Sequence, residues 1–308
     1  MIKNFSQTLY QILDVGQPFS HSLLQALSNP LPEDLCVFRR GWPAAVLERR
    51  RQVARALVQL AEDSPDLYFR DVFLLCLDDA DEIVRAAAID GLSDDESYDF
   101  LEHLLVMVVQ ESSLPVRCQV ILALGKFLYR IETTDLLSTY REQLVSVLLD
   151  IYHDAQAPLE ARRRALESVA YAADSELVEA AIAQAYGTPD SKMRASAVHA
   201  MGHHMAACWQ PHIERELVSP DAEMRYEAAH ACGELADEVL LPQLVPLLED
   251  DDHEVVREAI WALGEIGGQE ARRLLQRCLR HQDEDIRTAA EEALHILDFY
   301  ADPGQVLF

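Results

Sequence analysis

One short pattern recurs along the chain, and it constrains the fold more than any other feature. Each copy has an arginine, small or apolar residues three and six positions later, and often a glycine two positions beyond. We call the arginine position the anchor and each copy a repeat. The eight anchors are Arg50, Arg85, Arg117, Arg162, Arg194, Arg225, Val256 (with the arginine displaced to Arg257) and Arg287. The last three gaps are 31 residues each. Self-similarity at such a period predicts a stack of units that bury their apolar faces against their neighbours.

Each repeat holds two helical segments. Between successive anchors lies a second segment with its own apolar stripe of helical period, as in residues 242–250 and 270–279. The turns before the anchor helices are acidic, which suits helix N-termini because carboxylates accept their free N–H groups. These acids are Asp79, Asp81, Asp221, Glu223, and residues 250–252 and 283–285. We therefore predict an all-α fold, a right-handed α-solenoid of about eight helical hairpins without a sheet.

The repeats do not fill the whole chain. We predict an N-terminal helical cap over 1–42, a solenoid over 43–299 and a C-terminal tail over 300–308. The cap should hold short helices near 5–14, 20–28 and 33–39, separated by prolines. The 45-residue gap between Arg117 and Arg162 predicts an irregular repeat, with a longer loop and an extended first helix over 126–158.

The charge limits the partners. The chain has 26 basic and 53 acidic residues, a net charge of -27. Nucleic acids and anionic membranes are themselves polyanionic, so neither is an expected partner. The six cysteines are dispersed, without a C-x-x-C motif, and are expected to be reduced and mostly in the core. The sequence shows no secretory signal and no apolar run near the roughly 18–20 residues that span a bilayer. A cytoplasmic location is expected.

The repeats resemble HEAT repeats, in particular the bacterial type named after phycobilisome lyases. The resemblance covers roughly 43–299 and is most specific in residues 82–96, 162–186 and 224–268. The order of segments is similar to that of uncharacterised bacterial HEAT-repeat proteins. The resemblance implies an α-solenoid that offers a binding surface and implies no activity. Deoxyhypusine hydroxylase, a HEAT-like di-iron enzyme, carries His-Glu pairs just after the anchor, and none of the eight repeats has such a pair there.

The anchor helices should line the concave face of the solenoid. Positions one, five and nine after the anchor are four residues apart and share one side of a helix. In repeats four to seven these positions hold aromatic, histidine and charged residues. Aromatic residues and arginine are enriched in binding hot spots. The candidate binding residues are Arg163, Tyr171, His199, His203, Tyr226, His230, Glu234, Arg257, Trp261 and Glu265. We predict a non-catalytic scaffold that binds a basic protein or peptide there. The alternative is that these large side chains only pack on one another.

A second function remains open for the same residues. His199 and His203 are four apart on one helix, and His230 and Glu234 occupy the same positions on the next anchor helix. Two histidines at that spacing can share a metal. The alternative function is a metal-dependent or bilin-lyase-like enzyme that uses these histidines, although we predict neither a metal nor a cofactor. Six arginines between 39 and 55 could bind an acidic ligand or pair with the protein's own acids. The oligomeric state is not indicated.

Overall fold

The computed structural model describes residues 5–18, 20–134 and 136–301, which are helical without any strand. Its contacts separate two compact units, residues 1–127 and 128–308, which meet within helix α8 (Leu114–Thr134). The sequence predicted one continuous solenoid from residue 43, so this division is a new finding. Among the helices described, none combines the length and apolar character needed to cross a membrane.

The N-terminal unit begins with the predicted cap helices and continues into helical hairpins. Its helices are α1 (Phe5–Leu13), α2 (His21–Leu24), α3 (Pro32–Gly41), α4 (Leu47–Asp63), α5 (Arg70–Cys76), α6 (Glu82–Gly91), α7 (Tyr98–Gln110) and the first part of α8. Pro32 opens α3, where a missing backbone N–H costs no hydrogen bond. Helices α4 and α6 pack side by side, with α5 against α6.

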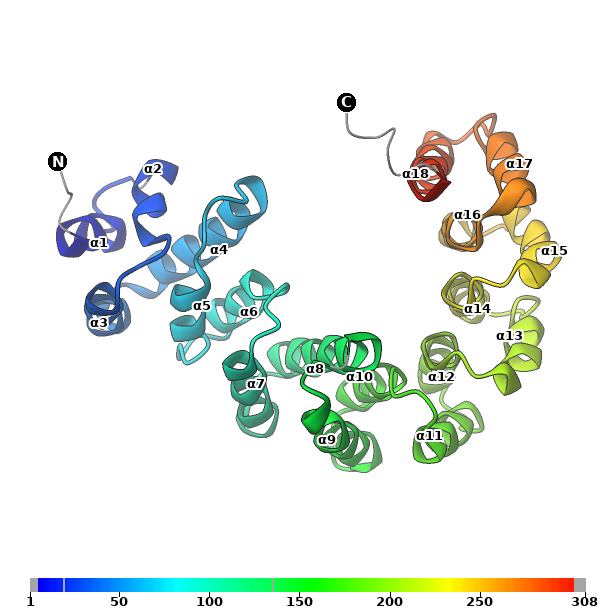
Figure 1. The fold of residues 1–308 in the computed structure, drawn as a ribbon, viewed down its shortest axis with the longest axis horizontal. Coiled ribbons are helices and arrows are strands. Elements are labelled where there is room, and N and C mark those ends of the chain that lie inside the picture. Colours follow the sequence, from blue (N-terminus) through cyan, green and yellow to red (C-terminus); the bar gives the residue numbers. More distant parts are fainter. Residues whose placement is uncertain (1–4, 19, 135, 302–308) are drawn as a thin grey trace. The chain divides into compact units, whose positions relative to one another are not determined.

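The C-terminal unit continues the same alternation (Figure 1). Its helices are α9 (Arg141–His153), α10 (Leu159–Val169), α11 (Glu176–Tyr186), α12 (Ser191–His204), α13 (Gln210–Glu216), α14 (Ala222–Leu235), α15 (Leu241–Leu244), α16 (His253–Ile266), α17 (Gly268–Cys278) and α18 (Glu284–Ala301). Helices α12, α14, α16 and α18 pack successively on one another, and the odd-numbered helices form a second row. Every anchor lies on an even-numbered helix, from α4 to α18. The predicted tail from residue 300 begins inside α18, and residues 302–308 lie outside the described part.

Small residues set the spacing between these helices. Ala228 and Ala231, three and six residues after the anchor of α14, are fully buried. A Cβ added to Gly202 on α12 would lie 2.7 Å from the Cα atom of Ala231. A Cβ on Gly264 of α16 would lie 3.1 Å from the Cβ atom of Ala293 on α18. The recurrent glycine therefore lets the next anchor helix approach at backbone distance.

At three anchors, Arg50, Arg85 and Arg225, the arginine ties its repeat to the next. Nη1 of Arg225 donates to the carbonyl of Ser219, six residues earlier, at 2.8 Å. Its Nε and Nη2 donate to both carboxylate oxygens of Asp250, six residues before the next anchor, at 2.7 and 2.8 Å. Arg85 repeats both contacts with the Asp79 carbonyl and the Glu111 carboxylate. Bidentate arginine–carboxylate pairs are strong and directional, so they fix the register of adjacent hairpins.

The acid six residues before an anchor has a second role. One oxygen of Asp250 accepts the backbone N–H of Asp252 at 2.9 Å, and Asp252 caps α16 by accepting from the N–H of Glu254. Asp79 accepts from the N–H of Asp81 in the same way, and Asp81 caps α6. The acidic turns therefore cap the helices, as predicted, and also receive the arginine of the previous repeat.

The irregular third repeat differs from the sequence prediction. Its long helix is the anchor helix α8, with 21 residues, whereas α9, predicted to be extended, has 13. At the end of α8 the hydroxyl groups of Thr133 and Thr134 donate back to the carbonyls of Tyr129 and Arg130. Leu137 then adopts a left-handed backbone conformation with φ of 60°. These local bonds satisfy the helix end and turn the chain.

The N-terminal arginines are used inside the protein. Arg51 pairs with Asp81 through two hydrogen bonds, Arg50 lies 3.2 Å from Asp79, and Arg49 donates to two backbone carbonyls. Arg40 donates to a backbone carbonyl of its own helix. Pairing with the protein's own acids and carbonyls therefore accounts for most of this cluster.

The cysteines follow the prediction in part. All six are free thiols, and four are buried, whereas Cys36 and Cys208 are exposed. Burial raises the pKa of Cys232 to about 12, so this thiol stays protonated at neutral pH.

Substitution of Gly202 tests the close approach of α12 and α14. We expect Gly202→Ala to destabilise the protein by about 1–3 kcal/mol, because its Cβ meets backbone that cannot move independently. Gly187→Ala is the matched control, since its Cβ would make only ordinary contacts at 3.6 Å. Urea unfolding of both variants measures the difference, and equal stabilities would contradict the packing described.

Substitution of Asp250 tests the link between repeats. We expect Asp250→Asn to cost about 1.5–3 kcal/mol at pH 7, the usual value of a hydrogen bond to a charged group. The hydrogen bonds from Arg225 hold the pKa of Asp250 below its ordinary value. Its contribution is therefore complete above about pH 4 and is lost as the pH falls through the lower folded pKa.

Urea unfolding at several pH values measures this effect. The stabilities of wild type and Asp250→Asn should converge in that acid range. The exposed neighbour supplies the control, Asp251→Asn, which should leave stability at pH 7 within about 0.5 kcal/mol of wild type. If Asp250→Asn lowers the free energy of unfolding no more than the control does, the proposed link does not stabilise the protein.

Candidate functional site

Six aromatic rings form a continuous row across the even-numbered helices of the C-terminal unit. The row contains, in spatial order, Tyr129, Tyr171, His203, His199, His230 and Trp261. Tyr171 stacks on His203 with ring centroids 4.3 Å apart, and His199 stacks on His230 at 4.8 Å. His230 in turn stacks on Trp261 at 4.7 Å and an interplanar angle of 12°. We call these six residues the aromatic row.

The repeat register produces this row. His199, His230 and Trp261 each lie five residues after an anchor, on α12, α14 and α16. Because the backbones of these helices approach closely, equivalent side chains come within stacking distance. The Trp261 ring lies directly against Gly233 of α14, where a Cβ would collide with it. Trp261 is therefore held in place by the helix before it.

The carboxylates beside the row follow a second register rule. Nδ1 of His199 lies 2.9 Å from Glu227, and Nδ1 of His230 lies 2.7 Å from Glu258. A carboxylate can only accept, so Nδ1 carries the proton in both histidines. Each pair joins position five of one repeat to position two of the next. The same positions form hydrogen bonds in two other repeats, between Gln119 and Asp90 at 3.1 Å and between Ser196 and Glu167 at 2.6 Å.

The row holds groups with strongly shifted pKa values. Burial, together with the neighbouring His199 and His230, lowers the pKa of His203 to about 3. Burial opposes the charged form of His199 too, but its hydrogen bond to Glu227 raises its pKa above the ordinary value. Burial and the charge of Glu234 raise the pKa of Tyr171 to about 12. The row therefore holds a neutral His203 beside a His199 that protonates readily.

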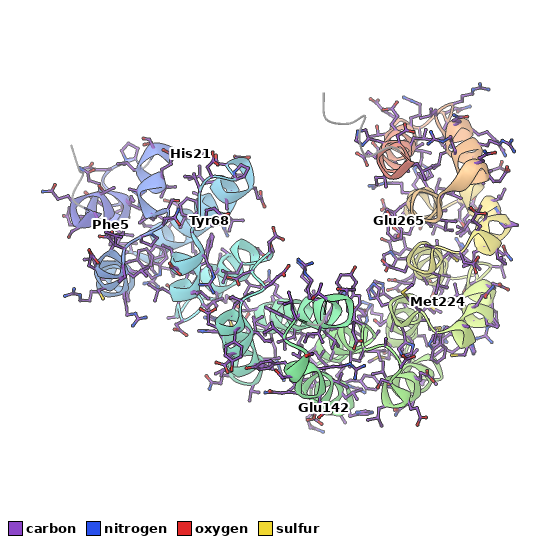
Figure 2. All side chains as sticks on the ribbon, in the orientation of Figure 1. Phe5, His21, Tyr68, Glu142, Met224 and Glu265 are labelled. Carbon is purple, nitrogen blue, oxygen red and sulfur yellow. The ribbon has the colours of Figure 1, made fainter. Side chains whose placement is uncertain are left out.

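Two carboxylates at position nine lie beside the row. Glu234 is on α14 and Glu265 is on α16, on the side of α16 away from α15 and α17 (Figure 2). Burial and the charge of Glu234 raise the pKa of Glu265. A carboxylate whose charge is disfavoured by burial and by a second carboxylate, next to an aromatic surface, forms a region that a cation would stabilise.

The row is partly buried by its own packing. The side chains of His203, His230 and His199 are 9%, 19% and 23% exposed, and that of Glu234 is 31% exposed. Much of the ring surface therefore packs on neighbouring rings, as the alternative interpretation predicted. Part of the surface of the three histidines and of Trp261 remains accessible, with the half-buried Glu234 and Glu265 beside it.

The other predicted residues have different surroundings. Arg163 is 8% exposed and donates to Ser196 at 2.8 Å and to Glu160 at 3.1 Å, so it belongs to the packing between α10 and α12. Tyr226 is partly buried, and burial and the neighbouring Glu258 raise its pKa. Arg257 is exposed and contacts Glu254 of its own helix.

The structure also adds residues that the sequence did not indicate. Tyr129 extends the row at an edge-on distance of 5.4 Å from Tyr171, although it lies twelve residues after its anchor, outside the three positions considered. Glu227 and Glu258 were missed because position two was tested only for His-Glu pairs and was not assigned to the concave face. Their signal was the recurrence of glutamate at that position in consecutive repeats.

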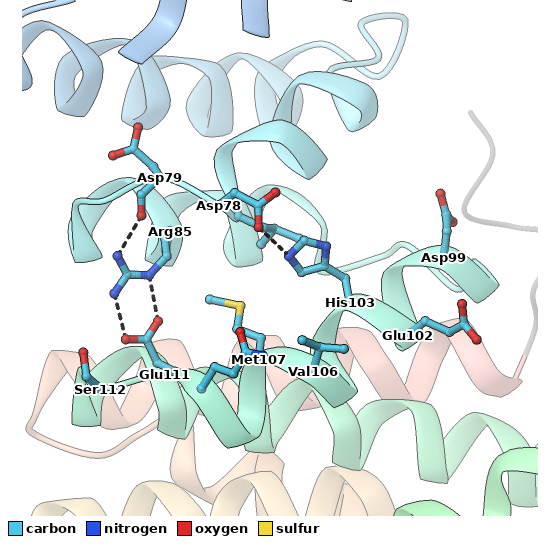
Figure 3. A pocket seen from close by; sticks show the side chains of 12 residues that line it. Asp78, Asp79, Arg85, Asp99, Glu102, His103, Val106, Met107, Glu111 and Ser112 are labelled. Carbon is cyan, nitrogen blue, oxygen red and sulfur yellow. Dashed lines mark hydrogen bonds and ion pairs between the residues drawn. The ribbon is translucent and has the colours of Figure 1, made fainter. Parts of the chain in front are cut away.

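A separate hollow of about 570 Å³ lies in the N-terminal unit (Figure 3). At one end Arg85 bridges the Asp79 carbonyl and Glu111, and nearby Nε2 of His103 lies 3.3 Å from Asp78. Arg85, which lines this hollow, is therefore already paired in the link between repeats.

Comparison with known proteins agrees with this architecture. Residues 211–295, from α13 into α18, match the family model of HEAT repeats. A chain in the structure of Kap95p bound to RanGDP is 13% identical, with a TM-score of 0.50, over 98% of this chain and 46% of that one. The E. coli protein YibA is 17% identical over 91% of this chain and 98% of its own, with a TM-score of 0.43. A designed armadillo repeat protein is 18% identical over 63% of this chain and 99% of its own, with a TM-score of 0.36.

Identities at this level show the fold alone. The chain spans less than half the length of the matched chain in the Kap95p structure. No curated protein matches the sequence. The helices, the anchors and these comparisons together define an all-helical α-solenoid with HEAT repeats over residues 211–295.

The shifted pKa of His203 is directly measurable. We expect the side-chain NMR signals of His203 to stay unchanged from pH 8 to about pH 4.5, because its pKa is about 3. The signals of His199 should titrate above the ordinary histidine value of about 6.5. Glu227→Gln should bring the His199 midpoint down. A His203 midpoint near 6.5 would contradict the burial of this ring.

Proposed function

We propose that the C-terminal unit binds a protein or peptide segment that carries lysine or arginine, and that the aromatic row is the contact surface. The observation that carries this proposal is the combination of Trp261 with Glu234 and Glu265. A cationic side chain over the Trp261 ring gains a cation–π interaction, and the two carboxylates add charge attraction. The raised pKa of Glu265 supports this, because an incoming cation relieves the repulsion from Glu234.

Two further observations support a binding role. The whole chain carries a net charge of -27, which attracts a basic partner over a distance and repels nucleic acids. HEAT and armadillo solenoids commonly serve as scaffolds, and the Kap95p match comes from a complex with RanGDP. The ring stacking also holds the surface rigid before binding, which lowers the entropy lost on association.

The proposed role is non-catalytic. Among the described residues, no feature favours the bilin-lyase-like alternative. The phycobilisome-lyase subtype of HEAT repeat, a bacterial source and a cytoplasmic location remain predictions from the sequence.

Selection from a displayed library of random peptides tests the partner chemistry. Wild type should enrich peptides with lysine or arginine, and a selected peptide should bind more weakly as salt rises. Glu234→Gln combined with Glu265→Gln should weaken the binding of that peptide at least about tenfold, or 1.4 kcal/mol, and should reduce the salt dependence of binding. Fluorescence anisotropy of the labelled peptide measures both effects.

The control is Asp251→Asn combined with Glu291→Gln, which changes charge equally at two exposed positions outside the row. Enrichment of peptides without basic residues, or equal loss in the control, would refute the proposed partner chemistry.

Truncating the aromatic side chains tests where the peptide binds. Trp261→Ala with Tyr226→Ala should cost at least about 2 kcal/mol of binding to the same peptide. Because Trp261 also packs on Gly233, melting curves must show that the variant is folded at the temperature of the assay. Tyr68→Ala, at an exposed tyrosine of the N-terminal unit, is the control and should bind as wild type. Unchanged binding by the folded double variant would place the site elsewhere.

A further inference from the structure

Three histidines of the aromatic row meet at one point. His199 and His203 lie one turn apart on α12, and His230 lies on α14. One ligand nitrogen from each lies within 4.8 Å of the other two. The ring centroids of His199 and His203 are 4.4 Å apart, and their planes are nearly perpendicular at 74°. Three imidazoles are a ligand set that zinc sites use.

The outer nitrogens of His199 and His230 are already engaged in the way metal sites require, whereas Nδ1 of His203 is buried without a hydrogen-bond partner among the described residues. His199 donates Nδ1–H to Glu227 and His230 donates Nδ1–H to Glu258. A metal-bound histidine almost always gives its other N–H to a carboxylate or carbonyl, which fixes the tautomer and strengthens the ligand. The unprotonated Nε2 atoms of both histidines then carry the lone pairs available to an ion.

A fourth donor lies beside them. Oε1 of Glu234 is 3.6 Å from Nε2 of His230 and 3.9 Å from Nε2 of His203. The Tyr171 hydroxyl lies 3.3 Å from the same nitrogen of His203. Imidazole nitrogens with one carboxylate oxygen form a donor set that suits zinc and its first-row neighbours.

The rings must turn for an ion to bind. Zinc–nitrogen bonds of about 2.0–2.1 Å in a tetrahedron place the donors about 3.3 Å apart, closer than they lie here. The nitrogen lone pairs lie in the ring planes, and the ring planes of His199 and His230 are parallel to within 3°. At least one of these two rings therefore rotates about its side-chain bonds. Rotation of His230 disturbs its stacking on Trp261, so the indole should report the event.

We propose that His199, His203 and His230, with Glu234 as a fourth ligand, bind one divalent ion of the zinc class. This inference does not depend on peptide binding. It assigns to the row a second ligand, held by three ring nitrogens and Glu234, whereas a peptide would contact the Trp261 ring and both carboxylates, so that the two sites share Glu234.

Titration of metal-free, untagged protein with zinc sulfate tests the proposal. We expect one equivalent to bind by calorimetry and to change the tryptophan fluorescence. Trp261→Phe should abolish the fluorescence change and keep the calorimetric binding. Cobalt chloride should produce the visible absorption bands of a four-coordinate nitrogen and oxygen site, and zinc should remove them.

Variants separate the histidine site from adventitious binding. His203→Gln and His230→Gln should each lower zinc affinity at least tenfold, and Glu227→Gln with Glu258→Gln should lower it about 10–100-fold. His295→Gln, at an exposed histidine of α18, should bind zinc as wild type. Circular dichroism and melting curves show whether each variant is folded.

Two results, both obtained with the wild-type protein, would overturn the proposal. They are a wild-type titration without a one-to-one zinc complex, and a cobalt complex without four-coordinate bands. Zinc binding lost equally in the His295→Gln control would also overturn it. Trp261→Ala, which should lose peptide, should keep the cobalt spectrum, so a failure of either role is seen independently.

Discussion

The salt link from one repeat to the next turn is the interaction on which the rest of the structure depends. The anchor arginine holds the carbonyl six residues before it and the acid six residues before the next anchor. The same acid accepts a backbone N–H in the turn that starts the next anchor helix. One side chain thus holds the N-cap residue of a helix and receives the arginine of the previous repeat. Where this position is an acid, in Asp79, Glu111 and Asp250, the preceding anchor arginine contacts it.

Close packing converts that register into a surface. Glycine at position eight and alanine at positions three and six let α12, α14 and α16 meet at backbone distance. Side chains at position five, such as His199 and His230, are then separated by about one ring thickness and must stack. The aromatic row is therefore a consequence of helix spacing. We propose that its histidine nitrogens, the Trp261 ring and the neighbouring carboxylates allow that stack to bind a metal or a cationic side chain.

The sequence predicted the parts that follow from periodicity. The eight anchors and the alternation of helices follow from the recurring pattern, and the meeting of His199, His203, His230 and Trp261 follows from the 31-residue period of the last repeats and a four-residue spacing. It did not predict the burial of Arg163, because that depends on which acid and hydroxyl of neighbouring helices reach it. Tyr129 escaped prediction because α8 is longer than the regular anchor helix and carries an extra turn into the row. Ring orientations depend on contacts between repeats, which period alone does not specify.

The indole NMR spectrum tests the role of the aromatic row most directly. The chain has three tryptophans, so the spectrum of the ¹⁵N-labelled protein should hold three indole signals. The indole of Trp42 donates to Asp79 and that of Trp209 donates to His204, so each already has a partner outside the row. Titration with a selected arginine-bearing peptide should shift the Trp261 signal and leave the other two in place. A peptide that binds while the Trp261 signal stays still would contradict the assignment of the aromatic row as the contact surface.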